Sequence, residues 1–156
     1  MKICLGGTFN IIHKGHRKLI HTALSVAGSD GFVFIGVAIG NLVKHKMGVK
    51  SFEERKNQLV SFLSDHIDLP TVVIEPISDI YGPTLKQDFN GIVVSHESVH
   101  NARLINIERE KRHLPVLKII EIPFVMADDG KPISNTRIQS GEITKEGKII
   151  SNDYID

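Results

Sequence analysis

Residues 5–19 of this chain read Leu-Gly-Gly-Thr-Phe-Asn-Ile-Ile-His-Lys-Gly-His-Arg-Lys-Leu. The stretch passes from an apolar strand pattern to a helix pattern through two glycines and a threonine. At such a junction, free backbone N–H groups and the positive end of the helix dipole attract anions. His13 and His16 stand three residues apart, so both rings project from one face of the first helical turn. We therefore predict a phosphate-binding turn here.

Apolar strand patterns alternate with helix patterns along the rest of the chain. The predicted strands are residues 3–5, 32–39, 71–74, 92–94 and 117–122, and the predicted helices are 13–27, 51–63, 97–112 and 134–139. Near-continuous apolar strands separated by helices favour a parallel sheet that is covered on both faces. Right-handed crossovers then give a Rossmann-like, doubly wound, five-stranded α/β fold. Ligands of such folds bind beyond the carboxyl ends of the strands.

Bulk properties predict one soluble domain. The 156 residues, of which 41% are hydrophobic and 24% charged, suffice for a single domain over 1–156. For residues 147–156 the pattern indicates no packing partner, so they are expected to pack on the domain, form an edge strand or fray. A net charge of +1, with no basic patch interleaved with aromatics, argues against a nucleic-acid partner. We expect a monomer or a small homo-oligomer.

The predicted location is the cytoplasm. The chain shows no signal-peptide pattern and no apolar stretch near the roughly 20 residues that a membrane helix needs. Cys4 is the single cysteine, which permits no internal disulfide and fits a reducing compartment. Because it lies in the first apolar run, we expect it to be a buried core thiol.

Two motifs resemble those of a known superfamily. The first, Gly-Gly-Thr-Phe-x-x-x-His-x-Gly-His at 6–16, resembles the signature of the nucleotidyltransferases that include the cytidylyltransferases. The second, Ile-Ser-Asn-Thr-Arg-Ile at 133–138, resembles the C-terminal triphosphate motif of that superfamily. Residues 51–55, 81–83, 93–97 and 127–132 are similar to segments of the archaeal and eukaryotic-type phosphopantetheine adenylyltransferases. The likeness runs from about residue 2 to residue 142.

The resemblance implies a fold order and a reaction. It implies the strand order 3-2-1-4-5 and adenylyl transfer from ATP to 4′-phosphopantetheine, which gives dephospho-coenzyme A and pyrophosphate. Mg²⁺ is expected to accompany the ATP. We predict no metal site made by the protein's own side chains, because two histidines leave a zinc site short of ligands. For residues 128–129 we expect a turn, with water-mediated magnesium contact as the alternative.

Four residues are predicted to act on the phosphates. His13 and His16 are expected to hydrogen-bond the α- and β-phosphates and the charge that develops on them. The resemblance implies a lysine that bridges the acceptor phosphate and the α-phosphate, and we favour Lys46 over its neighbour Lys44. Arg137 is expected to neutralise the leaving pyrophosphate. The alternative for the histidine pair is a helix-capping or core role, and the other six histidines are expected on the surface or in loops.

Further residues are expected to contact substrates. Ser95 and Glu97 follow the fourth strand, where nucleotide contact and simple N-capping are rival interpretations. For Arg55 the rivals are contact with the acceptor and a surface ion pair. For Tyr81 they are contact with the pantetheine arm or an adenine edge, and loop packing. The predicted binding residues are Gly6, Gly7, Thr8, Phe9, Asn10, Lys44, Arg55, Tyr81, Ser95, Glu97, Ser134, Asn135 and Thr136.

Asn10 departs from the family pattern, which has aspartate after Thr-Phe. Asparagine keeps the hydrogen-bonding capacity of aspartate but lacks its negative charge. If that carboxylate places magnesium or orients the acceptor, the activity of this chain would be lower.

Two rival functions stand beside the adenylyltransferase. The first is another transferase of the same fold, such as a cytidylyltransferase or a nicotinamide-mononucleotide adenylyltransferase. Residues 130–132, Gly-Lys-Pro, differ from the Arg-Thr-x-Gly pattern usual before this motif in cytidylyltransferases. The second is a non-catalytic nucleotide-binding regulatory protein, for which Asn10 is the motive; the intact His13, His16 and Arg137 argue against it.

Overall fold

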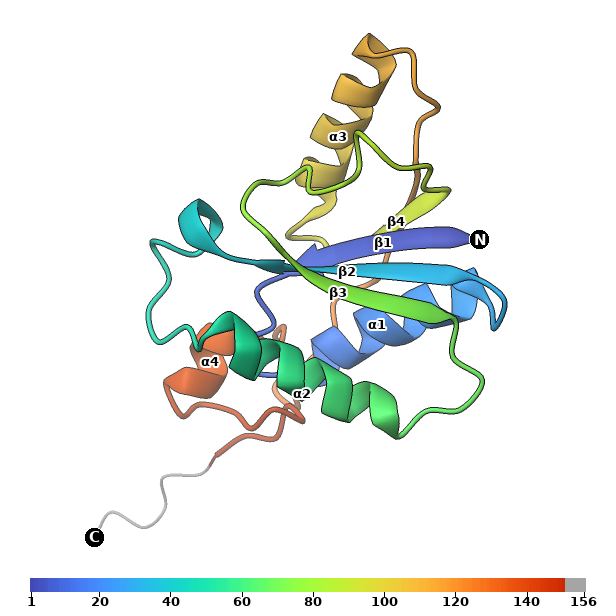
Figure 1. Cartoon of the computed structure of the whole chain (residues 1–156). Coiled ribbons are helices and arrows are strands. Elements are labelled where there is room, and N and C mark those ends of the chain that lie inside the picture. The colour runs from blue at the N-terminus through green and yellow to red at the C-terminus, as the bar shows by residue number, and fades with distance from the viewer. Residues whose placement is uncertain (151–156) are drawn as a thin grey trace, which may run out of the picture.

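Five parallel strands form the centre of the computed structural model, which describes residues 1–150 (Figure 1). The strands are β1 (Lys2–Gly7), β2 (Phe32–Ala38), β3 (Thr71–Ile77), β4 (Gly91–Val94) and β5 (Lys118–Glu121). Their order is β3-β2-β1-β4-β5, and every neighbouring pair is parallel. The order reverses between β1 and β4, where such sheets leave a crevice for ligands. The predicted fold class and strand order are confirmed.

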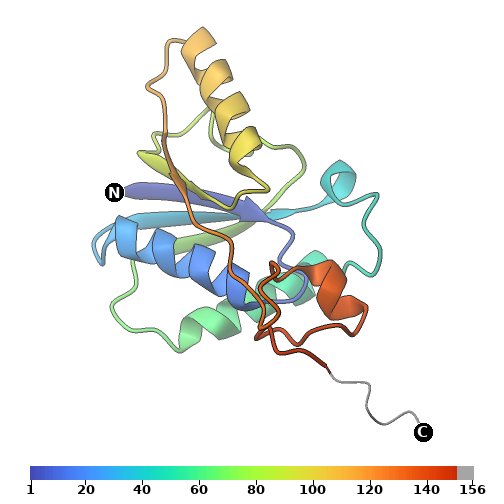
Figure 2. The same cartoon turned by 180° about the vertical axis from the view of Figure 1, so that it is seen from behind.

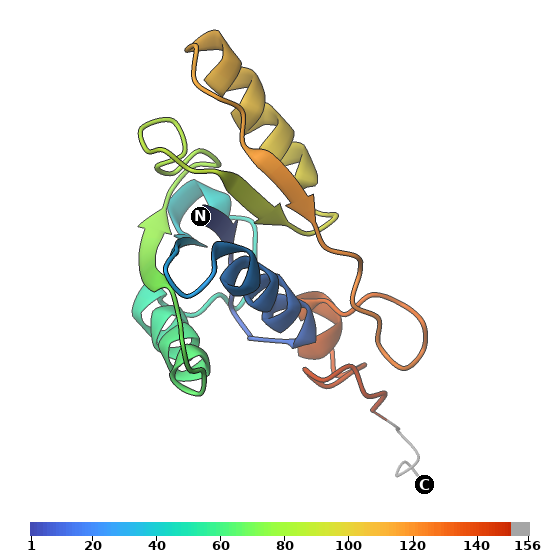
Figure 3. The ribbon, with the colours of Figure 1, turned by 90° about the vertical axis from the view of Figure 1, so that its right-hand side faces the viewer.

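Helices cover both faces of the sheet. Helices α1 (Lys14–Ala27) and α2 (Phe52–Ser64) lie on one face, and α3 (Val99–Lys111) lies on the other (Figures 1 and 3). Ile20 of α1 and Leu59 of α2 are fully buried against β1 and β2 in one apolar cluster. Ala102 and Ile105 of α3 belong to a second cluster on the opposite face. Because each buried aliphatic side chain contributes about 1.5–3 kcal/mol, these two clusters fix the helices on the sheet.

Local sequence signals set the ends of α1 and α2 close to the predicted positions. His13 is the N-cap of α1, and Gly28 ends that helix with a φ of 79°. Ser51 caps α2 by accepting a hydrogen bond from the Glu54 backbone N–H at 3.2 Å. Strand β3 runs three residues past the predicted Ile74, through a proline, to Ile77. It lies at the edge of the sheet, where proline is tolerated because fewer backbone N–H groups are needed for pairing.

The short elements gather at the carboxyl ends of the strands. They are the 3₁₀ helix η1 (Gly40–Leu42) and helix α4 (Asn135–Gln139), and both lie beyond the strand arrowheads (Figures 1 and 2). A third apolar cluster of Ala127, Ile133 and Ile143 supports α4. Ile143 forms an antiparallel bridge with Ile149, so residues 147–150 of the predicted tail pack on the fold. The rest of that tail, residues 151–156, lies outside the described residues.

The sequence also predicts a buried cysteine and no membrane-spanning helix. Cys4 is 2% exposed, and burial raises its thiol pKa to about 12, so the predicted buried core thiol is confirmed. Within residues 1–150, no helix has the length and apolar character needed to cross a membrane.

Candidate active site

The carboxyl ends of β1, β2 and β4 open onto a cavity of about 780 Å³. This volume is within the usual range for sites that bind small molecules. Most of the predicted site residues lie on its wall: Gly6, Gly7, Thr8, Phe9, Asn10, His13, His16, Lys46, Ser95, Glu97, Ser134, Asn135 and Thr136. The wall therefore combines the histidine motif, the loop after β2 and the start of α4, which are far apart in the sequence.

The two histidine rings are stacked, and the contact at Nδ1 defines the tautomer of His13. Their centroids are 3.8 Å apart with 14° between the ring planes. Nδ1 of His13 accepts a hydrogen bond from the His16 backbone N–H at 3.3 Å, so the neutral His13 ring carries its proton on Nε2. Nδ1 of His16 lies 2.9 Å from the Ile11 carbonyl oxygen, which accepts, and 3.4 Å from the His13 backbone nitrogen, which donates. Either neutral tautomer of His16 therefore has a partner at Nδ1, and the tautomer that is protonated on Nε2 offers a donor from that atom.

Burial keeps both rings neutral at pH 7. It lowers the pKa of His13 to about 4, assisted by the charge of Arg17. It lowers the pKa of His16 to about 3, assisted by the proximity of His13 and Lys46. A bound anion beside the rings would raise both pKa values, because it stabilises the protonated form. The two rings therefore favour an anionic ligand, because its negative charge would stabilise their protonated form.

The neutral histidines predict acid sensitivity of the fold. Below pH 6.5 the unfolded chain binds protons at these residues, whereas the native chain does so only near pH 4 and 3. Stability therefore falls as the pH drops from about 6.5, and lowering the pKa of His13 to about 4 accounts for about 3 kcal/mol of that loss. Urea unfolding at pH 7 and pH 4.5 measures the effect. The His13→Asn, His16→Asn double variant should lose much less stability between these pH values, and an equal loss would contradict the assignment.

Phe9 and Gly15 shape the space around the histidine pair. Phe9 is fully buried at a φ of 51°, and its ring centroid lies 5.1 Å from that of His16. It supports the His16 ring from within the core. A Cβ on Gly15 would lie 2.8 Å from Cε1 of His13, closer than real Cβ contacts. Gly15 was not predicted to have a role, although its place between the two histidines was the available signal.

The loop after β2 brings Lys46 to the phosphate-binding turn. Nζ of Lys46 donates a hydrogen bond to Oγ1 of Thr8 at 2.6 Å. The Asn10 amide nitrogen donates to the Gly48 carbonyl oxygen at 3.0 Å, and its oxygen accepts from the Lys50 backbone N–H at 2.8 Å. Lys44 is exposed and does not line the cavity. The structure therefore brings Lys46, and not Lys44, to the histidine motif.

Arg55 is a buried structural residue that holds three backbone segments together, which corrects both predictions made for it. The residue is 3% exposed, so it neither reaches the cavity nor forms a surface ion pair. Its guanidinium donates to the carbonyl oxygens of Thr8 at 3.0 Å, Ala38 at 2.6 Å and Lys50 at 2.9 Å. Burial lowers the pKa of Arg55. The side chain joins the end of β2, the turn after β1 and the loop that carries Lys46.

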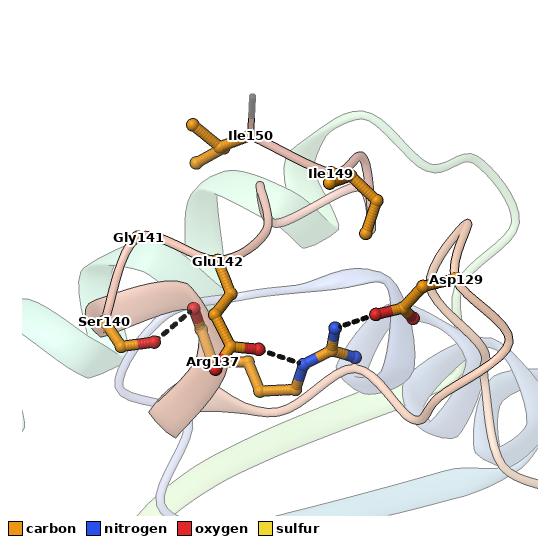
Figure 4. Close-up of a pocket in the computed structure, with 7 residues that line it drawn as sticks. All are labelled: Asp129, Arg137, Ser140, Gly141, Glu142, Ile149 and Ile150. Carbon is orange, nitrogen blue, oxygen red and sulfur yellow. Dashed lines mark hydrogen bonds and ion pairs between the residues drawn. The ribbon is translucent and has the colours of Figure 1, made fainter. Parts of the chain in front are cut away.

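Arg137 does not share the cavity of the histidines, contrary to prediction. It lines a separate pocket of about 300 Å³ and lies between Asp129 and Glu142 (Figure 4). It pairs with Glu142 at 2.8 Å, pairs closely with Asp129, and donates to the carbonyl oxygens of residues 131 and 132. The carboxylates of Glu142 and Asp129 raise the pKa of Arg137. A hydrogen bond from the Lys131 backbone N–H lowers the pKa of Asp129, and the neighbouring Arg137 lowers it further. Contact with pyrophosphate would require displacement of both carboxylates.

The remaining predicted contacts divide between the cavity and the core. Tyr81 does not line the cavity. It packs against the second apolar cluster, on the face of the sheet that α3 covers, as its loop-packing alternative predicted. Ser134 uses its hydroxyl to accept a hydrogen bond from the Arg137 backbone N–H, which caps α4. Residues 128–129 form the predicted turn, which is followed by Gly130 at a φ of 78°.

Two histidines on the cavity wall were not predicted there. His45 stands in the loop beside Lys46, and its position at the ligand-facing end of β2 was the available signal. His96 lies 3.2 Å from a Glu121 carboxylate oxygen, and its ring centroid is 4.9 Å from that of Phe124. Its place directly after β4 was the corresponding signal.

A parallel sheet with a phosphate-binding turn and two histidines at its switch point defines a nucleotidyltransferase-type site. The chain belongs to the cytidylyltransferase-like family, whose sequence profile matches residues 4–141. It is 39% identical over 150 residues to a phosphopantetheine adenylyltransferase of Methanosarcina acetivorans, and the aligned region covers 95% of each chain. It is 41% identical over 150 residues to a protein of that name from Methanothermobacter thermautotrophicus, over 95% of this chain and 88% of that one.

A solved structure shows the same architecture. The crystal structure of a protein of unknown function from Archaeoglobus fulgidus superposes with a TM-score of 0.69 at 33% identity. The superposition covers 78% of this chain and 89% of that chain. The family resemblance found in the sequence is confirmed by these matches.

Proposed function

We propose that this protein transfers the adenylyl group of ATP to 4′-phosphopantetheine, which gives dephospho-coenzyme A and pyrophosphate. The observation that carries the proposal is the cavity in which His13, His16, Lys46 and the N-terminus of α1 meet. The relatives named phosphopantetheine adenylyltransferases, which match almost the full chain, support this choice of substrates. The reaction belongs to coenzyme A biosynthesis, and we place it in the cytoplasm.

The chemistry needs positioning and charge stabilisation rather than a covalent intermediate. An oxygen of the 4′-phosphate attacks the α-phosphorus of ATP in line, the bond from that phosphorus to the bridging oxygen breaks, and pyrophosphate leaves. The turn after β1 offers backbone N–H groups and the positive end of the α1 dipole. His13 donates from Nε2, and Lys46 places an ammonium beside Thr8. These donors stabilise the charge that spreads over the transferred phosphoryl group.

The donor set on the wall fits magnesium that arrives with the nucleotide. Among the described residues, Glu97 is the one carboxylate that lines the cavity. Residues 1–150 contain no group of three or more histidine, cysteine or acidic side chains that could hold a metal ion. Mg²⁺ usually binds through substrate phosphates and one or two carboxylates, so Glu97 would be its protein contact. When bound, the ion neutralises phosphate charge and orients the leaving group.

Substrate exchange tests the proposal directly. Pyrophosphate release should require ATP, 4′-phosphopantetheine and Mg²⁺ together. CTP in place of ATP, or nicotinamide mononucleotide in place of 4′-phosphopantetheine, should reduce the rate by at least about tenfold, because binding contacts discriminate at that level. A faster rate with CTP or nicotinamide mononucleotide would assign the chain to another transferase of this fold. Nucleotide binding without release under any pairing would favour the regulatory alternative.

Gly15→Ala is expected to separate activity from stability. The new methyl group would displace the His13 ring, so we expect kcat to fall by about tenfold or more. Alanine has a higher helix propensity than glycine by about 1 kcal/mol, which offsets the loss of the His13 cap, so the thermal midpoint should change little. Steady-state pyrophosphate release and thermal unfolding provide the two readouts. Unchanged kcat would show that the ring position does not matter for turnover.

A further inference from the structure

We propose that Asn10 is a positioning residue that holds the Lys46 loop, residues 43–50, on the phosphate-binding turn, and that this role requires an amide rather than a carboxylate. The link to catalysis rests on the proposed function, because it acts through Lys46. The hydrogen bonds themselves do not depend on which reaction the protein catalyses. Asn10 is the motif position where the family pattern has aspartate, which makes the choice of residue testable.

Both ends of the Asn10 side chain are used on this loop. The amide nitrogen donates to the Gly48 carbonyl oxygen, and the amide oxygen accepts from the Lys50 backbone N–H. The partners fix the orientation of the amide, because a flipped group would place two acceptors and two donors opposite each other. The side chain is 3% exposed, so water does not substitute for a lost partner without rearrangement.

A carboxylate at position 10 would satisfy only half of this arrangement. It would still accept from the Lys50 N–H, but it has no proton to donate to Gly48. Its charge would face the Gly48 carbonyl oxygen in a partly buried contact, where two acceptors repel. We therefore expect aspartate to release the loop at Gly48, which stands two residues after Lys46.

The tip of the loop has little other support. Met47 is 89% exposed, and Gly48 adopts a φ of 68°. On the sheet-facing side, Arg55 holds the Lys50 carbonyl oxygen, and Thr8 accepts from the Lys46 side chain. The Asn10–Gly48 bond is thus the contact that ties the loop backbone beside Lys46 to the β1 turn. Loss of this contact would let the Lys46 ammonium move away from Thr8.

Such a movement is expected to slow the reaction rather than to unfold the protein. Displacement of a catalytic group by about 1 Å can cost on the order of 10²-fold in rate. This expectation is opposite to the one drawn from the sequence, in which a carboxylate at position 10 would increase activity if it places magnesium or orients the acceptor. The sign of the change therefore separates the two interpretations.

Asn10→Asp is compared with Asn57→Asp, which makes the same chemical change at an exposed position of α2. Hydrogen exchange of residues 43–50 should be at least about tenfold faster in Asn10→Asp and unchanged in Asn57→Asp. Asn10→Ala, which removes both bonds without adding charge, should show the same faster exchange. If Asn10→Asp does not fold, Asn10→Ala takes its place in every comparison. Unchanged exchange in the position-10 variant would overturn the proposal.

Kinetics then test whether Asn10 acts through Lys46. We expect Asn10→Asp to lower kcat by about tenfold in the otherwise unaltered protein, and by less than about twofold in the Lys46→Ala background. A general structural defect would lower kcat equally in both backgrounds, and that result would contradict a positioning role. An Asn10→Asp protein with equal or higher kcat would also overturn it.

A failure of the proposed function would be recognised separately. If the unaltered protein releases no pyrophosphate with ATP and 4′-phosphopantetheine, the same two-background comparison is made with the dissociation constant of ATP. Weaker ATP binding only where Lys46 is present would support the positioning role of Asn10. Equal weakening in both backgrounds, or none, would refute it.

Discussion

His16→Ala is expected to lower kcat by about 10²-fold or more, the loss seen when one preorganised donor to a developing oxyanion is removed. His16 stacks on His13, rests on Phe9 and faces the cavity at the start of α1. Its removal takes away a polar group at the phosphate-binding turn and the stacking partner of the second histidine. Steady-state pyrophosphate release with ATP and 4′-phosphopantetheine measures the loss.

A matched histidine controls for unspecific effects of this substitution. His66 follows α2, contacts His21 and does not line the cavity, so His66→Ala should retain near-normal kcat. His16→Asn, which restores a short polar side chain, should recover only part of the rate because it reaches less far into the cavity. Near-normal turnover by His16→Ala would remove the histidine pair from the mechanism.

Arg55→Met is expected to lower the free energy of unfolding by about 3 kcal/mol, because buried carbonyl oxygens that lose their donor cost about 1–3 kcal/mol each. Two such carbonyls, those of Thr8 and Ala38, depend on this guanidinium, and the partly buried carbonyl of Lys50 depends on it as well. Urea unfolding at pH 7 measures the change. Arg103→Met, at an exposed position of α3, is the matched control and should change stability by less than about 0.5 kcal/mol.

The same variant distinguishes a structural role of Arg55 from direct binding of the substrate. A residue that binds the acceptor phosphate would raise the KM for 4′-phosphopantetheine and leave the unfolding midpoint unchanged. For Arg55 we expect the unfolding midpoint to fall, with kcat reduced because the turn after β1 and the Lys46 loop lose their common support. An unchanged unfolding midpoint would contradict the buried role.

The sequence was sufficient where a pattern is local. Strand β2 is an unbroken apolar run, and parallel strands covered on both faces require that composition. The caps at Ser51 and Ser134 follow from a hydroxyl that satisfies an N–H three residues later. The phosphate-binding turn could be placed because its glycines and histidines are adjacent in the chain. Such features need no knowledge of distant partners.

The arginines could not be assigned from sequence because their partners decide their roles. Arg55 bonds to Thr8, which is 47 residues away, and no spacing rule connects the two positions. Arg137 stands in a motif that suggests a phosphate contact, yet Asp129 and Glu142 compete for the guanidinium. A motif gives the residue type and its neighbours, whereas three-dimensional packing determines which acceptor lies nearest.

Asn10 illustrates a second limit of prediction from sequence. As a departure from a family pattern, it suggests a missing charge and a weaker site. In the structure, the amide has two backbone partners on a loop about 40 residues away, which a carboxylate could not satisfy together. A substitution within a motif can therefore be matched to a contact that lies outside the motif.

The most direct test of the central claim follows the α-phosphorus of ATP. With α-³²P-labelled ATP, 4′-phosphopantetheine and Mg²⁺, we expect the label to appear in dephospho-coenzyme A, with one pyrophosphate released per labelled product. Appearance of the label in free AMP or ADP, with none in dephospho-coenzyme A, would contradict adenylyl transfer by this protein.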